Sequence, residues 1–207
     1  MVISMFFGIY LIYKYKLPQY LKIITIYTTI AGIGAIIALL IHFKFSYVWH
    51  VVINIFDATT VLLLSLLTYF FCSLLPNKYI RYIAVIFIFS LILTVIILIK
   101  DWNSSLLSRS FIVSNFALIL MAITYYWDLL NSEPRIDILR DPAFWVVTGI
   151  FIGMAANVVL LTLSHLLFVK YDYLRYALTS IFASFFYAFM HLFFVKAFIC
   201  YRNSRQS

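Results

Sequence analysis

Long apolar runs separated by short polar connections dominate the sequence. A helix that spans a membrane needs about 20 mainly apolar residues, with a range of roughly 17–25. Most of the runs reach that length, and the shorter first run ends in tyrosines that suit a membrane interface. The pattern therefore predicts seven spanning helices, at about residues 2–15, 20–43, 46–75, 79–99, 106–130, 143–168 and 172–200.

Composition places these helices in lipid. Of the 207 residues, 66% are apolar, 20% are aromatic and 11% are charged, whereas a soluble domain averages roughly 45–50% apolar and about 25% charged residues. One core cannot bury that much apolar side chain, so the lipid bilayer must be a main partner. We therefore expect an all-α polytopic membrane protein, a seven-transmembrane-helix bundle in which residues 1–207 form a single transmembrane domain.

The basic residues predict how such a bundle is oriented. The net charge of +8 comes from lysines and arginines that stand singly or in pairs between apolar runs, where they determine topology and meet headgroups. They form no basic face with a groove-reading element, which argues against nucleic-acid binding. Most of them fall on the inner side if the N-terminus is outside and the C-terminus inside. We expect this arrangement in a bacterial cytoplasmic (inner) membrane.

Three polar residues interrupt the third apolar run. His50, Asn54 and Asp57 are spaced i, i+4 and i+7, so a helix places them on one stripe. A carboxyl group inside a spanning helix costs a few kcal/mol even on the lenient insertion scale, so Asp57 should face protein or water. In the predicted topology, Asn157 and His165 on the sixth helix reach the same outer half of the bundle.

These five residues define the predicted site, which would bind a small ligand, an ion or a proton. Asp57 would be the buried acceptor or proton site, with Asn54 and Asn157 as orienting amides. His50 and His165 would be outer-rim donors or pH-sensitive gates. A second interpretation stays open, in which the histidines lie in interfacial water and the other three residues only fix helix packing. A metal site needs three or four converging ligands, which nothing in the spacing enforces, so we expect no metal and no cofactor.

Tyr187 and His191 lie on the last predicted helix, deeper toward the cytoplasm. A hydrogen bond to a neighbouring helix explains them, and the alternative is that they form the inner part of a polar path. Lys196 lies one turn from the predicted end of this helix, where snorkelling to the interface explains it. A retinal Schiff base needs a lysine near the middle of the helix, so a microbial rhodopsin is excluded.

The pattern argues against an enzyme. The chain resembles seven-helix intramembrane metal hydrolases in placing Asp57 on the third helix and His191 on the seventh. That family also needs an HxxxH pair on the seventh helix and Ser-x-x-x-His on the second. Here His191 is single, and His42 is preceded four positions back by Ala38. Nucleophile–base triads, Gly-rich phosphate loops and HExxH are absent from the sequence too.

Two short motifs carry a second resemblance. Asp141 and Pro142 predict the start of the sixth helix, because Asp is a favoured N-cap and Pro suits the first helical position. The run DPAFWVVTG from Asp141, followed by Asn157, and the NIFD run at 54–57 are similar to features of small seven-helix bacterial membrane proteins, where the second acid is more often Glu. The resemblance implies this topology and a pairing of the third and sixth helices, and it implies no chemistry.

Taken together, these patterns predict a non-enzymatic sensor or accessory module with a polar site in its outer half. The alternative is a proton-coupled transporter or a pore-forming effector, which needs a continuous polar path from Asp57 through Tyr187 and His191. Because the tail after the last helix is short, a signal would leave through a cytoplasmic partner protein at the loop 131–142. A homo-oligomer is also compatible with this interpretation.

Overall fold

Six α-helices and one short 3₁₀ helix make up the part of the chain that the computed structural model describes. The described residues are 1–44, 49–75, 84–85, 87–88, 104–131, 138–167 and 172–205, and side chains are described over 1–37, 40, 59–75, 84–85, 87–88, 111–131, 138–163 and 181–205. The helices are α1 (Val2–Lys14), α2 (Gln19–Lys44), α3 (Trp49–Leu74), α5 (Ser104–Asn131), η1 (Ile138–Arg140), α6 (Pro142–Leu167) and α7 (Asp172–Ser204).

The expected seven-helix bundle is wrong. Among the described residues there are six α-helices, and four stretches are long and apolar enough to cross a membrane: Gln19–Ile37, Phe111–Asn131, Pro142–Leu163 and Ile181–Ser204. α1 has 13 residues, about 20 Å at 1.5 Å per residue, which is less than the roughly 30 Å hydrocarbon core. The apolar stretch described in α3, Thr59–Leu74, is also short. The helix expected at 79–99 lies almost entirely outside the described residues. The four long apolar helices fit an integral membrane protein.

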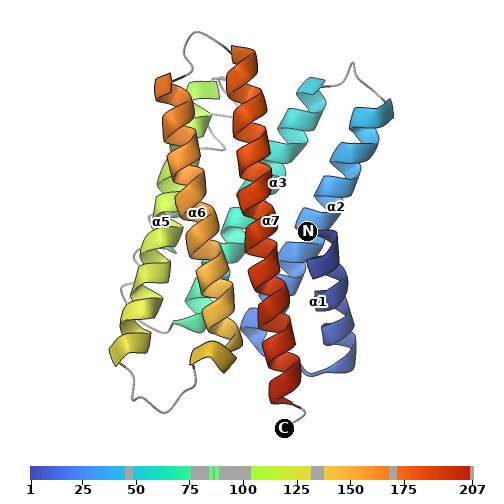
Figure 1. The fold of residues 1–207 in the computed structure, drawn as a ribbon, viewed down its shortest axis with the longest axis vertical. Coiled ribbons are helices and arrows are strands. Elements are labelled where there is room, and N and C mark those ends of the chain that lie inside the picture. The colour runs from blue at the N-terminus through green and yellow to red at the C-terminus, as the bar shows by residue number, and fades with distance from the viewer. Residues whose placement is uncertain are drawn as a thin grey trace.

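The helices contact one another in a closed ring. Along the ring α1 packs on α2, α2 on α3, α3 on α5, α5 on α6, α6 on α7 and α7 back on α1, and α2 also touches α7 beside α1. Figure 1 shows that α2 ends and α3 begins at the same end of the bundle at which α6 ends and α7 begins. The turn from α1 to α2 and the C-terminus lie at the opposite end. Among the described residues α3 therefore packs mainly against α2 and α5, and α6 is not the direct neighbour of α3 that the motifs implied.

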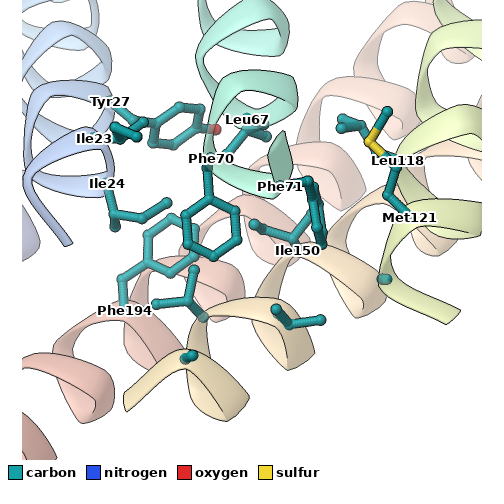
Figure 2. Packing of buried hydrophobic residues seen from close by; sticks show 14 of the residues in the cluster. Ile23, Ile24, Tyr27, Leu67, Phe70, Phe71, Leu118, Met121, Ile150 and Phe194 are labelled. Carbon is teal, nitrogen blue, oxygen red and sulfur yellow. The ribbon is translucent and has the colours of Figure 1, made fainter. Parts of the chain in front are cut away.

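Aromatic and branched side chains fill the ring. Phe70 and Phe71 of α3 are fully buried, and their ring centroids lie 5.2 Å apart in an edge-to-face arrangement. In Figure 2 Phe71 lies beside Ile150 of α6, and Phe70 lies toward Ile24 and Phe194. The outer faces are also apolar, as Ile181, Phe182, Phe185 and Leu192 of α7 show. Lipid tails are as apolar as these faces, so the hydrophobic effect does not drive the helices together in a membrane. Close packing and hydrogen bonds must therefore hold the ring together.

Glycines allow the closest helix contacts. On α6, a Cβ atom at Gly149 would lie 2.8 Å from Phe193 Cβ and 3.1 Å from the carbonyl oxygen of Met190, and one at Gly153 would lie 3.1 Å from Met190 Sδ. On α1, a Cβ at Gly8 would lie 2.7 Å from Thr25 Cγ2. These two pairs of neighbours, α6 with α7 and α1 with α2, therefore approach at distances that only a residue without a side chain permits.

The start of α6 confirms the predicted cap. The backbone N–H of Ala143 donates to Asp141 Oδ1 at 3.0 Å, and Tyr125 Oη donates to Asp141 Oδ2 at 3.0 Å. Just before it, η1 is held by a hydrogen bond of 2.8 Å from Trp145 Nε1 to the Leu139 carbonyl oxygen. The preceding loop residues 132–137, within the region expected to bind a partner protein, lie outside the described residues.

Candidate functional site

Asn157 and Tyr187 join the two most closely packed helices through a polar contact. Asn157 lies on α6 and its Nδ2 donates to Tyr187 Oη of α7 at 2.9 Å. Both side chains are partly buried, so neither is sealed away from a small molecule. The sequence pointed to each residue separately, Asn157 as part of the outer site and Tyr187 as part of an inner path, and the structure brings them together.

This pair keeps hydrogen-bonding capacity after bonding to itself. With Asn157 Nδ2 donating to Tyr187 Oη, the amide oxygen is still an acceptor and the phenol proton is still a donor. The orientation of the amide is assigned from its partners. In the opposite orientation the amide oxygen accepts from Tyr187, which leaves the amide N–H groups as donors and the phenol oxygen as an acceptor. A small uncharged molecule that both donates and accepts hydrogen bonds would match the pair.

One turn further along α7, His191 is almost fully buried. Its side chain is 3% exposed, and its Nδ1 lies 2.8 Å from Ser4 Oγ of α1. Its other ring nitrogen, Nε2, is covered by protein and has no hydrogen-bond partner among the residues that the structure describes. Tyr187 and His191 are four residues apart, so they lie on the same face of α7 about 6 Å apart along its axis.

The Ser4 hydroxyl limits the protonation patterns of the neutral His191 ring. Ser4 Oγ also lies 2.7 Å from the Met1 carbonyl oxygen, and a hydroxyl has a single proton to donate. If that proton goes to Met1, Nδ1–H of His191 donates to Ser4 and Nε2 is an unmet acceptor. If it goes to His191, Nε2–H is an unmet donor. Either arrangement leaves one buried polar atom unsatisfied, which costs about 1–3 kcal/mol.

Aromatic rings surround His191. The centroid of the Tyr27 ring on α2 lies 6.2 Å from that of His191, and Phe194 lies 5.5 Å away in an edge-to-face arrangement. Tyr27 is itself 2% exposed. Ser4 and Tyr27 were not predicted as neighbours of His191, and the signal available for Ser4 was a serine in an otherwise apolar run.

The threonines of α2 do not contribute polar groups to this region. Thr25 Oγ1 donates to the Leu21 carbonyl oxygen at 2.9 Å, and Thr28 and Thr29 donate to the Thr25 carbonyl oxygen at 3.0 and 2.8 Å. These hydroxyls bond within their own helix, as is usual for Thr in helices. Ser4, Asn157, Tyr187 and His191, with Tyr27 beside them, are therefore the polar groups described so far in this region.

Four of the predicted site residues lie outside the side chains that the structure describes. Asp57, Asn54 and His50 belong to α3 and His165 belongs to α6, but only their helical backbone is described. The helix ends that carry His50 and His165 lie at the same end of the bundle (Figure 1). Their convergence with Asn157 stays a prediction.

Neither possible metal ligands nor related proteins point to a further candidate site. Within the described residues no group of three or more His, Cys, Asp or Glu side chains could hold a metal ion. No family model, no curated protein and no solved structure matches the chain.

Proposed function

We propose that this chain is a non-enzymatic membrane protein of a bacterial cytoplasmic membrane that acts as a sensor or accessory module. It binds a small polar ligand among its central helices, next to Asn157 and Tyr187. The observation that carries the proposal is the 2.9 Å hydrogen bond between these two residues, from two different spanning helices, with both donor and acceptor capacity left over. The bacterial setting is supported by the resemblance of the Asp141 and Asn54–Asp57 motifs to small bacterial membrane proteins.

In this proposal the residues of the predicted outer site complete the binding groups. Asp57 and Asn54 would supply an acceptor and an amide from α3, and His50 and His165 would line the rim. Binding would act on helix packing, since Asn157 lies on α6 and Tyr187 on α7, and these two helices come into close contact at Gly149. A ligand that breaks or strengthens their bond changes how α6 and α7 pack.

Accessibility to water tests this proposal without knowledge of the ligand. Cys72 and Cys200 are replaced by serine, and Asn157→Cys is compared in proteoliposomes with Val159→Cys, whose parent side chain is 55% exposed on the outside of the bundle. Thiols react as thiolates, which form in water and not in lipid. We expect a water-soluble methanethiosulfonate to label position 157 much faster than position 159. Equal labelling at both positions would show that Asn157 and Tyr187 only fix packing.

Proton-coupled transport or a pore is the second candidate. One observation favours this candidate. Asn157 bonds to Tyr187, and one turn further along α7 lies His191, whose Nε2 has no partner among the described residues. The same labelling distinguishes the two functions. A transporter or pore should expose His191→Cys to reagent from the opposite side of the membrane, whereas a sensor should keep position 191 closed from that side.

A further inference from the structure

Tyr201 organises a group of basic residues at the end of the bundle where α1 turns into α2. Its side chain is 7% exposed, and its Oη donates to the Lys16 carbonyl oxygen at 2.8 Å. The same oxygen accepts a hydrogen bond of 3.3 Å from Arg205 Nε, and the Arg205 guanidinium lies 5.6 Å from the centre of the Tyr201 ring. The Lys16 backbone and the Arg205 side chain, which are far apart in sequence, therefore meet at the Tyr201 hydroxyl.

Arg202 adds a third cation next to them. It is partly buried in the last turn of α7, and its Nε is covered by protein without any acceptor. An arginine carries five N–H donors in a rigid fork, and the one on Nε of Arg202 meets no acceptor in the part of the chain that the structure describes. Burying Nε without an acceptor is costly, and the two terminal nitrogens of the guanidinium are not among the covered atoms, so they are free to bind an anion from outside the protein.

The nearby carboxylate is already engaged elsewhere. Asp141 accepts from Tyr125 Oη with one oxygen and from the Ala143 backbone N–H with the other. Asp141 makes no ion pair with Lys16, Arg202 or Arg205 among the described residues. Lys14 and Lys22 are exposed on the adjoining turns of α1 and α2, so among the described residues the surface around Tyr201 carries more basic than acidic groups.

The position of this group relative to the membrane points to a particular anion. Lys16 precedes the apolar stretch that begins at Gln19, and Arg202 and Arg205 lie at the end of the stretch that finishes at Ser204. These cations therefore lie at the depth of the lipid headgroups. A phosphate suits them because a guanidinium fork binds two of its oxygens at once, and anionic lipid attracts each basic residue near the surface.

We propose that Lys16, Arg202 and Arg205 around Tyr201 form a binding site for the phosphate of an anionic phospholipid. The site would prefer phosphatidylglycerol to phosphatidylcholine, whose phosphate charge is balanced by its own headgroup. This inference does not rest on the polar site at Asn157.

Native mass spectrometry of the full chain in detergent tests the site. Phosphatidylglycerol or phosphatidylcholine of the same tails is titrated, and we expect tighter binding of phosphatidylglycerol that weakens about fivefold with each charge removed in Arg202→Gln and Arg205→Gln. Lys196→Gln is the matched control, because Lys196 lies at the same end of the bundle but 5.5 Å from the Trp145 ring. It should leave binding nearly unchanged.

Three outcomes would overturn the proposal. They are equal binding of the two lipids, an equal loss in Lys196→Gln, and displacement of phosphatidylglycerol by the same concentration of glycerol 3-phosphate. The last would assign the site to a free phosphate compound instead of a lipid. Arg202→Lys keeps the charge without the fork and should fall between wild type and Arg202→Gln. If Arg202→Gln does not fold, Arg205→Gln, at an exposed position, tests the same site.

Discussion

Ser4 and His191 lie 187 positions apart in the chain, and the Ser4 hydroxyl oxygen is 2.8 Å from His191 Nδ1. The bond attaches the short helix α1 to the middle of α7. Because His191 is buried and its second nitrogen has no partner, the serine is its one polar partner among the described residues. The two residues therefore depend on each other for stability.

Removing only the serine should be more harmful than removing both partners. Ser4→Ala leaves both ring nitrogens of His191 unsatisfied, and we expect it to lower the free energy of unfolding by about 1–3 kcal/mol. Adding His191→Leu should recover part of that loss, since no buried polar atom is then left. Unfolding in SDS titrations measures both. Ser65→Ala is the control, because Ser65 bonds only to its own helix at Val61, and a loss as large as that of Ser4→Ala would contradict the prediction.

The contact of α6 with α7 should not tolerate a methyl group at Gly149. Its Cβ would lie 2.8 Å from Phe193 Cβ and 3.1 Å from a backbone oxygen, neither of which can move away without separating the helices. We expect Gly149→Ala to cost about 1–3 kcal/mol, seen as a lower melting temperature in detergent. At Gly34 the new Cβ would lie 3.6 Å from Thr59 Cγ2, an ordinary contact. Gly34→Ala should therefore be neutral or stabilising, and an equal loss at both positions would refute this explanation.

The start of α6 should depend on Asp141. Asp141→Ala removes the N-cap acceptor of Ala143 and the acceptor of Tyr125, so we expect a loss of about 0.5–2 kcal/mol for the cap and faster hydrogen exchange in the first turn of α6. Asp141→Asn keeps an acceptor and should lose less. Asp128→Asn removes a charge from the end of α5 without touching the cap. If it matched Asp141→Ala, the loss would reflect charge rather than capping.

The bond between Asn157 and Tyr187 can be measured with a double-mutant cycle. Asn157→Leu and Tyr187→Phe are made singly and together, and the coupling free energy follows from unfolding in SDS. Hydrogen bonds between membrane helices average about 0.6 kcal/mol and reach about 1.7, and we expect a coupling in this range. A coupling indistinguishable from zero would mean that the 2.9 Å contact contributes nothing to packing.

Local signals in the sequence predicted the ends of helices better than the number of spans. Asp141 followed by Pro142 marks the start of α6, because capping depends only on residues within one turn. Hydropathy, by contrast, treated residues 2–15 as a span although α1 has 13 residues. An apolar run reports that a segment avoids water, and a helix too short to span avoids water equally well where lipid covers its exposed side chains, such as Ile3 and Phe6.

The candidate site shows where single-sequence reasoning stops. Asn157, Tyr187 and His191 could be selected because polar groups inside a span are costly. Their partners could not be selected, since which face of α1 meets α7 depends on packing at Gly8 and Phe198, and no periodic pattern in so uniform a helix reveals that face. Ser4 was missed for this reason.

The contact between Tyr201 and Lys16 has a consequence for biosynthesis. The two residues are 185 positions apart and 2.8 Å from each other. At about 5–20 residues per second, the ribosome makes Tyr201 roughly 10–40 s after Lys16. Throughout that interval the first hairpin, α1 with α2, has no α7 to complete it. The insertion machinery or neighbouring lipid must therefore shelter the hairpin until the last helix arrives and closes the ring.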